Sequence, residues 1–245
     1  MISGNTRELY LKKIKENIQK HGYHLYVVVG GQSPRYAYTI GLTESPINAE
    51  LVFAGGYCFD KNEVKKIIDY LVNYFRINKI SSDIVVDYKN VAKFKFKQVD
   101  QTWVKAALLG CVDYYSSESV SAYQITPCDE LATKEIPDMS RSYDINTEPI
   151  WRWLTERWGY NVPNDSIAAT NSFALTGAPI LEVSRWEDNY WEAFSFSVDL
   201  VEKDDVVILP LGVLLGMDAT LEKITKLNVG ESMCRDNIDS PWKLR

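Results

Sequence analysis

A histidine and a group of hydroxyl and carboxyl side chains in the first third of the chain are the residues best suited to chemistry. His24 is followed by Tyr38, Thr39, Glu44 and Glu50 within 26 positions. Together they could supply the imidazole, hydroxyl and carboxylate contacts of a ligand-binding site. A hydrolase built from His24, Glu44 and Glu50 is a further possibility, because imidazole and carboxylate groups act as general acids and bases.

Residues 36–44 have the alternation of a β-strand, with two tyrosines on one face and Thr39 and Gly41 on the other. A glycine inside a strand allows a ligand or another backbone to approach closely. The same glycine could instead form a tight corner of a barrel. Both interpretations remain open at this stage.

Sequence motifs of established catalytic sites are missing. There is no Gly-x-Ser-x-Gly elbow, and neither Gly30-Gly31 nor Gly55-Gly56 extends into a dinucleotide- or phosphate-binding loop. The four cysteines stand singly, without a Cys-x-x-Cys pair, so we expect reduced thiols and no metal site. We therefore predict no catalytic residues, and the sequence favours a protein that is not an enzyme.

A second candidate site lies in the last hundred residues, which contain six of the seven tryptophans. Aromatic and charged side chains alternate there at Arg185, Trp186, Asp188, Trp191 and Glu192. If exposed, this combination is typical of protein-binding surfaces. If buried, the tryptophans would form part of a core.

Charge divides the chain into two halves. Residues 1–145 hold 18 Lys and Arg against 17 Asp and Glu, whereas residues 146–245 hold 9 against 16. An acidic surface repels nucleic acid and attracts basic proteins, so we expect no nucleic-acid partner and consider a basic protein such as a toxin. Solubility alone could also explain the charge.

We expect no membrane span, because the apolar runs are far shorter than the about 20 residues that a span needs. We also expect a cytoplasmic location, because the start lacks a secretory signal.

The first segment reads as an α+β domain over residues 1–130, with a mostly antiparallel sheet and flanking helices. Asp60 and Glu63 have the spacing of a capping box in front of an apolar helical stripe. Helices are predicted at 6–20, along the apolar stripe from Val64 to Phe75, and at 102–115. Strands are predicted at 23–29, 36–42, 50–54, 83–88, 91–99 and 121–125.

Residues 131–149 read as a connecting loop, and residues 150–245 as a smaller, acidic, Trp-rich α+β domain. In this domain we predict a short helix at 150–158, a hairpin of strands 179–186 and 190–198, a strand at 206–209 and one or two helices within 210–227.

Three stretches of the first segment together resemble a known family. They are His21-Gly-Tyr-His, Tyr36-Ala-Tyr-Thr-Ile-Gly-Leu-Thr and Ala49-Glu-Leu-Val-Phe-Ala-Gly, and they resemble the opening of the bacterial domain-of-unknown-function family 4262. The resemblance covers about residues 15–130. It differs at Asn48-Ala49-Glu50, where the family usually has a proline before the glutamate.

The second segment is similar to the uncharacterised family 2185, whose members resemble immunity proteins of bacterial toxin systems. The similarity rests on Ile180-Leu-Glu-Val, Trp191-Glu-Ala-Phe, the stretch from Leu209 to Asp218, and Gly230 with Arg235. Neither resemblance implies catalytic residues. Both imply a bacterial cytosolic protein, and the second implies one that neutralises a toxin by direct contact.

The sequence thus favours an immunity- or antitoxin-type binding protein with the acidic second segment as its contact surface. The alternative is a small-molecule or flavin-binding domain, since the β-rich first segment is loosely similar to split-barrel flavin proteins.

Overall fold

The chain forms two compact units, each described here by itself. The computed structural model describes residues 4–128, 131–197 and 201–245. The first unit comprises residues 1–28, 35–131 and 138–143, and the second comprises residues 29–34, 132–137 and 144–245. Within the predicted connecting loop, residues 138–143 therefore belong to the first unit, while 132–137 and 144–149 belong to the second. Residues 1–3, 129, 130 and 198–200 of the predicted segments lie outside the described part of the chain.

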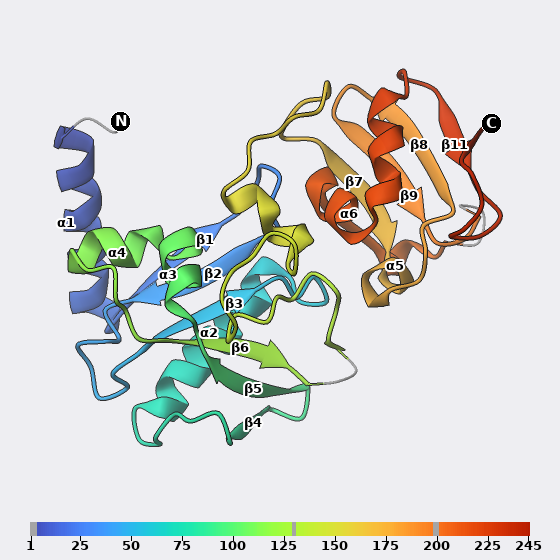
Figure 1. Ribbon diagram of the computed structural model, residues 1–245. Coiled ribbons are helices and arrows are strands. Elements are labelled where there is room, and N and C mark those ends of the chain that lie inside the picture. The colour runs from blue at the N-terminus through green and yellow to red at the C-terminus, as the bar shows by residue number, and fades with distance from the viewer. Residues whose placement is uncertain (1–3, 129–130, 198–200) are drawn as a thin grey trace. The chain divides into compact units, whose positions relative to one another are not determined.

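The first unit is built on a mixed sheet that is mostly antiparallel (Figure 1). Its described elements are α1 (Gly4–His21), β1 (His24–Val28), β2 (Tyr36–Ile40), β3 (Glu50–Ala54), α2 (Lys61–Phe75), β4 (Val85–Tyr88), β5 (Ala92–Gln98), α3 (Gln101–Ala107), α4 (Leu109–Tyr115) and β6 (Ala122–Pro127). The strand order is β1-β2-β3-β6-β5-β4, and of these neighbouring pairs β3 and β6 run parallel. The predicted α+β class is confirmed.

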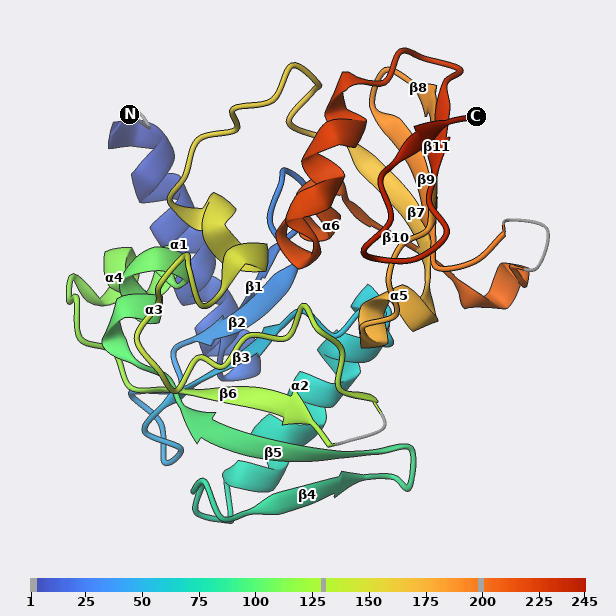
Figure 2. The same cartoon turned by 45° about the vertical axis from the view of Figure 1, so that its right-hand side comes forward.

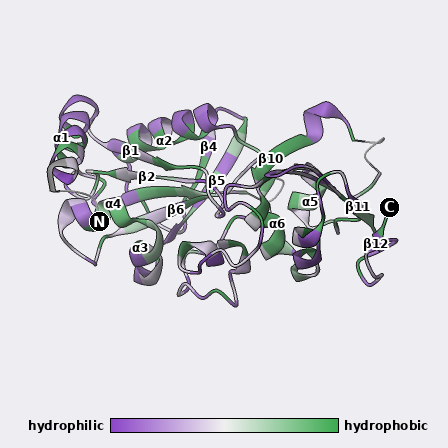
Figure 3. Cartoon of the chain, turned by 90° about the horizontal axis from the view of Figure 1, so that it is seen from above, coloured by the Kyte–Doolittle hydropathy of each residue, from purple (hydrophilic) through white to green (hydrophobic). Residues whose placement is uncertain are grey.

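One face of this sheet packs on α2, which buries its apolar stripe against it. Val64, Ile67, Ile68, Leu71, Val72 and Phe75 are the buried residues of the helix. They meet Leu51, Phe53, Phe94 and Phe96 of the strands in one core. The hydrophilic side of α2 faces away from the sheet (Figure 3). This amphipathic pattern explains why the helix could be predicted from spacing alone.

The helix predicted over residues 102–115 is in fact two helices, α3 and α4, and the break coincides with a contact from a distant part of the sequence. Leu108 leaves the helical conformation at φ −94° and ψ 43°. The backbone N–H of Gly110 donates to the hydroxyl oxygen of Tyr38 at 3.0 Å instead of continuing the helical ladder. A Cβ at Gly110 would lie 2.7 Å from that oxygen, so this position suits only glycine. A long-range contact therefore divides a helix that spacing alone predicts as continuous.

The second unit contains a second mixed sheet, of order β10-β7-β9-β8-β11-β12, in which β7 and β9 run parallel. Its described elements are the 3₁₀ segments η2 (Pro149–Leu154), η4 (Lys203–Asp205) and η5 (Ala219–Lys226), the helices α5 (Ser172–Thr176) and α6 (Leu211–Met217), and the strands β7 (Ile167–Asn171), β8 (Glu182–Glu187), β9 (Tyr190–Phe194), β10 (Val206–Pro210), β11 (Ser232–Cys234) and β12 (Lys243–Leu244).

One face of the second sheet is covered by α6 (Figure 2). Two glycines let this helix pack closely within its unit. A Cβ at Gly216 would lie 2.4 Å from the Cα of Ile150, and one at Gly212 would lie 2.4 Å from the carbonyl oxygen of Gln32. Trp153 completes the contact, since its indole N–H donates to the carbonyl of Gly212 at 3.1 Å. The glycines of this apolar stretch therefore serve close packing rather than flexibility.

The predicted hairpin of β8 and β9 and the strand β10 are confirmed, whereas β7 was missed. The sequence of β7, Ile-Ala-Ala-Thr-Asn, carries small residues without clear alternation, and four of its five residues are buried. A central strand covered on both sides need not alternate, so periodicity could not reveal it.

The N-terminus of α2 supplies a stability prediction. The Asp60 carboxylate accepts hydrogen bonds from the backbone N–H groups of Asn62 (2.6 Å) and Glu63 (2.8 Å), and Glu63 accepts one from the backbone of Asp60. We expect Asp60→Ala to lower the free energy of unfolding by about 1 kcal/mol, because two N–H groups lose their acceptor. Urea denaturation measures this change. The control is Asp83→Ala, which removes an exposed carboxylate elsewhere and should change the free energy by less than about 0.5 kcal/mol. Equal effects of the two substitutions would show that the cap contributes nothing.

Candidate functional site

The centre of the first candidate site is the carboxylate of Glu50, which is fully buried at the start of β3. Hydroxyl groups donate to it from Thr39 (2.6 Å), Tyr115 (2.6 Å) and Thr43 (3.1 Å). Backbone N–H groups of Gly41 and Thr43 also donate to it, each at 3.0 Å. Five donors thus surround one carboxylate, as the burial of such a group requires.

The donors around Glu50 are themselves held by further hydrogen bonds. The Thr39 hydroxyl accepts from the backbone N–H of Leu51 at 2.8 Å, and the Tyr115 hydroxyl accepts from that of Gly41 at 2.8 Å. The Cys111 thiol donates to the carbonyl of Thr39 at 3.4 Å, and burial raises the pKa of this thiol. Because each hydroxyl both donates and accepts, the network ties β2, β3 and α4 together.

Burial also sets the protonation of Glu50. It raises the pKa of this carboxyl group above its ordinary value of 4.5, while the hydrogen bonds from Thr39, Tyr115 and Thr43 oppose the shift. A carboxyl group with no exposed surface and its oxygens already engaged has little capacity left for a ligand. The site of Glu50 and Thr39 is therefore an internal polar network.

The other candidates of the first segment have separate surroundings. The Nδ1 atom of His24 lies 2.8 Å from the side-chain nitrogen of Asn17, and burial lowers the pKa of this histidine. Tyr38 is buried against Gly110, and Glu44 is exposed. Among the described residues, no hydrogen bond or ion pair joins His24, Glu44 and Glu50. The structure thus brings together Thr39 and Glu50, but not the set that a hydrolase would need.

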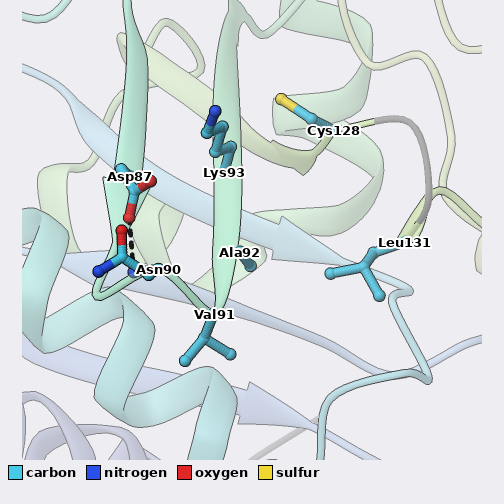
Figure 4. Close-up of a pocket in the computed structure, with 7 residues that line it drawn as sticks. All are labelled: Asp87, Asn90, Val91, Ala92, Lys93, Cys128 and Leu131. Carbon is cyan, nitrogen blue, oxygen red and sulfur yellow. Dashed lines mark hydrogen bonds between the residues drawn. The ribbon is translucent and has the colours of Figure 1, made fainter.

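A hollow of about 470 Å³ lies elsewhere in the first unit, at the turn between β4 and β5 (Figure 4). Its lining residues are Asp87, Asn90, Val91, Ala92, Lys93, Cys128 and Leu131. The Asp87 carboxylate accepts from the backbone N–H of Asn90 at 2.7 Å, which holds the turn. The Lys93 ammonium points away from this turn. The polar groups do not converge, so the hollow lacks the arrangement of a catalytic or ligand site.

In the second unit, Arg185 and Trp191 lie on the inner face of the sheet. Trp191 is fully buried, and the guanidinium carbon of Arg185 lies 4.8 Å from the centroid of its ring. The same guanidinium donates to the carbonyls of Leu227 (2.7 Å) and Asp188 (2.8 Å). These two predicted contact residues therefore stabilise the turn between β8 and β9 from within and are closed to a partner. The Asp188 carboxylate is 90% exposed.

Trp186 and Glu192 lie on the opposite, outer face. A β-bulge between Arg185 and Glu187 places Trp186 outward with 53% of its surface exposed. Glu192 pairs with Ser184 across the strands and accepts no hydrogen bond from any residue in the described part of the chain. Both residues line a hollow of about 230 Å³ over β8, β9 and β11. Of the five predicted contact residues, the structure thus brings these two together on an accessible surface.

No metal site or membrane span is found within residues 4–128, 131–197 and 201–245. No three His, Cys, Asp or Glu side chains approach closely enough there to hold an ion. No helix in these ranges is both long and apolar enough to cross a membrane. The four cysteines, all of which lie within these ranges, form no disulfide bond.

The comparisons with known proteins concern the first unit. Residues 17–132 match the family model described as Domain of unknown function (DUF4262). This match confirms the resemblance of the first segment. No curated protein and no solved structure matches the chain.

Several residues of the stretches that resemble the family make internal contacts. Gly22 ends α1 at φ +84°, and its N–H donates to the carbonyl of Ile18 at 2.7 Å, which explains the His-Gly pair. Thr39, Gly41 and Glu50 belong to the buried carboxylate network. In this chain, these residues thus position the elements of the first unit.

Several structural residues escaped the sequence reasoning. Thr43 and Tyr115 were not recognised as partners of Glu50, although a glutamate at the head of an otherwise apolar strand signals an internal partner. Arg235 was noted only as part of a resemblance. Its buried guanidinium donates to the Asp218 carboxylate at 2.6 Å, 17 residues away in the sequence. Such pairs appear only once the chain is folded.

The Glu50 network leads to a stability prediction. Tyr115→Phe removes a donor to Glu50 and an acceptor for Gly41, and we expect the free energy of unfolding to fall by about 1–3 kcal/mol. Chemical denaturation at pH 7 measures it. Tyr114→Phe is the matched control, because this neighbouring hydroxyl takes no part in the Glu50 network, and it should change the value by less than about 0.5 kcal/mol. A Tyr115 variant as stable as the control would contradict the network's role.

The raised pKa of Glu50 predicts a pH dependence. A carboxyl group that holds its proton more tightly when folded favours folding most at low pH, and this contribution declines as pH rises from 4.5 through the folded pKa. We therefore expect the stability of the wild-type protein, relative to Glu50→Gln, to decrease across this window. Denaturation curves of both proteins at a series of pH values test it. A relative stability that increases with pH would show that the pKa is lowered instead.

Proposed function

We propose that this protein acts by binding a basic protein partner, as immunity and antitoxin proteins do, through the outer face of its second sheet. The observation that carries the proposal is the pairing of an exposed Trp186 with the Glu192 carboxylate on that face. An aromatic ring beside a charged group is the composition of residues that dominate protein binding.

The charge of the second half supports a basic partner. Residues 146–245 carry 16 acidic against 9 basic side chains. Glu187, Asp188, Glu202 and Asp204 are exposed in this region. A surface of this sign accelerates the approach of a positively charged protein and repels nucleic acid.

Apolar side chains on the same face support a protein rather than a small ion as the ligand. Ile208 is 56% exposed, and the strand register places it opposite Ala169, which in turn lies opposite Glu192. Val206 is 37% exposed and, two residues away on the same strand, shares this face. Exposed apolar groups flanked by acids are typical of surfaces that another protein covers.

The resemblance of the second segment to immunity-like proteins favours the toxin-neutralising class, in the cytoplasm of a bacterium. The residues that carry the resemblance include Asp218, Arg235 and the glycines of α6, which stabilise this unit. The stretch Trp191-Glu-Ala-Phe also belongs to the resemblance, so Glu192 is shared between the resemblance and the proposed binding surface.

The alternatives find less support. A flavin or other small-molecule ligand would have to reach Thr39 and Glu50, which are fully buried and engaged with each other. A hydrolase would need His24 and the acids to share contacts, yet His24 contacts Asn17 instead. Binding by the second unit therefore has the stronger basis.

The proposal is tested with the partner identified by native mass spectrometry after gentle purification from the host. Its affinity for the full chain is then measured by calorimetry with wild type, Trp186→Ala and Glu192→Lys. We expect each substitution to weaken binding at least tenfold, because the first removes a large apolar contact and the second repels a basic surface. The association rate should also fall with added salt.

Glu8→Lys is the matched control, since it makes the same charge reversal on an exposed position of α1 in the first unit. The affinity of this variant for the partner should stay within about twofold of wild type, because salt screens exposed charges that lie far from the contact surface. A partner that binds all four proteins equally would place its contact surface elsewhere and overturn the proposal.

A further inference from the structure

We infer that the hollow between Trp186, Glu192 and Glu182 binds an arginine side chain of the partner, and that Arg245 partly occupies this position in the free protein. The inference rests on the proposed function and specifies the chemistry of its contact. The hollow, about 230 Å³, is smaller than typical small-molecule sites of about 300–1,000 Å³. Its size therefore suits one side chain rather than a free cofactor.

The charges in the hollow favour binding of a cation. The carboxylates of Glu182 and Glu192 both line it, and the only positive group among its lining residues is the guanidinium of Arg245. Arg245 forms an ion pair with Glu182. Glu192 has no such partner in the described part of the chain. The charged side chains that line the hollow thus carry one net negative charge, and the unpaired group is the Glu192 carboxylate.

Trp186 provides a flat aromatic wall for that cation. The face of an indole ring attracts a guanidinium group, and arginine is the commoner partner of such rings. Trp186 is exposed on this face and, among the described residues, carries no stacked cation.

The same unit uses this chemistry three times internally. Guanidinium groups lie over Trp153 at 4.2 Å, over Trp191 at 4.8 Å and over Trp242 at 4.5 Å, measured from the guanidinium carbon to the ring centroid. Each of these stacks is supplied by an arginine of the chain. Trp186, with a carboxylate beside it, has the same surroundings but is open to an arginine from outside.

Arg245 shows where a guanidinium can be held. Its backbone N–H donates to the carbonyl of Ser232 at 2.9 Å, which places it beside β11. Its side chain reaches Glu182 and remains 59% exposed. A side chain that is exposed and held by one ion pair is weakly fixed, so a partner's arginine can displace it. Arg245 then acts as an internal competitor for the site.

The experiment uses the full chain and two capped tripeptides, Gly-Arg-Gly and Gly-citrulline-Gly, which differ in charge but hardly in shape. Binding is followed by the NMR shift of the assigned Trp186 indole N–H. We expect the arginine peptide to bind with a dissociation constant on the order of 1 mM, since a single side chain makes the contact, and the citrulline peptide at least fivefold more weakly.

Three variants locate the contact. Glu192→Gln should weaken binding of the arginine peptide at least fivefold, whereas Arg245→Ala should strengthen it about threefold by removing the competitor. Glu187→Gln is the control, because it removes the same charge from an exposed residue that does not line the hollow. It should leave the affinity within about twofold of wild type.

Equal binding of the arginine and citrulline peptides, or no shift of Trp186 with either, would overturn the inference. The comparison of the two peptides with wild-type protein decides this even if a variant fails to fold. Failure of this inference can also be distinguished from failure of the proposed function. A partner that binds while the peptides do not would leave the binding role intact and remove the arginine site alone.

Discussion

A carboxylate with no exposed surface is the constraint on which the first unit depends. Glu50 can be buried at the head of β3 only because Thr39, Thr43, Tyr115 and the backbone at Gly41 all donate to it. Losing one donor would leave charge or a polar atom unsatisfied in a region of low polarity, which costs more than an ordinary hydrogen bond contributes. The loop after β2 and the end of α4 must therefore adopt conformations that present these donors.

The same constraint bears on the match between the first unit and the family model. The matched range, residues 17–132, includes residues with internal partners, such as Gly22 at the end of α1 and Glu50 in its network. Such residues describe how the unit folds and say little about what it binds. Function is better sought on the surface, where the outer face of the second sheet combines an exposed tryptophan, apolar side chains and the Glu192 carboxylate, which has no partner in the described part of the chain.

Much of the fold could be predicted because it follows local rules. The stripe of α2, the capping residues Asp60 and Glu63, and the alternating lysines and phenylalanines of β5 are each readable from spacing. The break between α3 and α4 could not be predicted, because it depends on the Tyr38 hydroxyl more than 70 positions away. The central strand β7 was hidden by its small residues. Long-range contacts and strands buried on both faces leave little trace in a single sequence.

The candidate sites, too, could be predicted only in part from the sequence. Sequence reasoning named Thr39 and Glu50 among five candidate ligand-binding residues, and Trp186 and Glu192 among five candidate contact residues, without pairing them. It could not tell which side of the sheet faces solvent. Register and the bulge at Trp186 decide that Trp191 is enclosed while Trp186 is open. The direction of a side chain was thus the information that only the fold supplied.

The central claim is that the outer face of the second sheet is the binding surface, and hydrogen exchange measured by mass spectrometry tests it most directly. The full chain is compared alone and saturated with its partner. Our account predicts slower exchange in the peptides that contain β8, β9 and β11, with little change in residues 17–132. Protection centred on residues 17–132, with none on these strands, would contradict it.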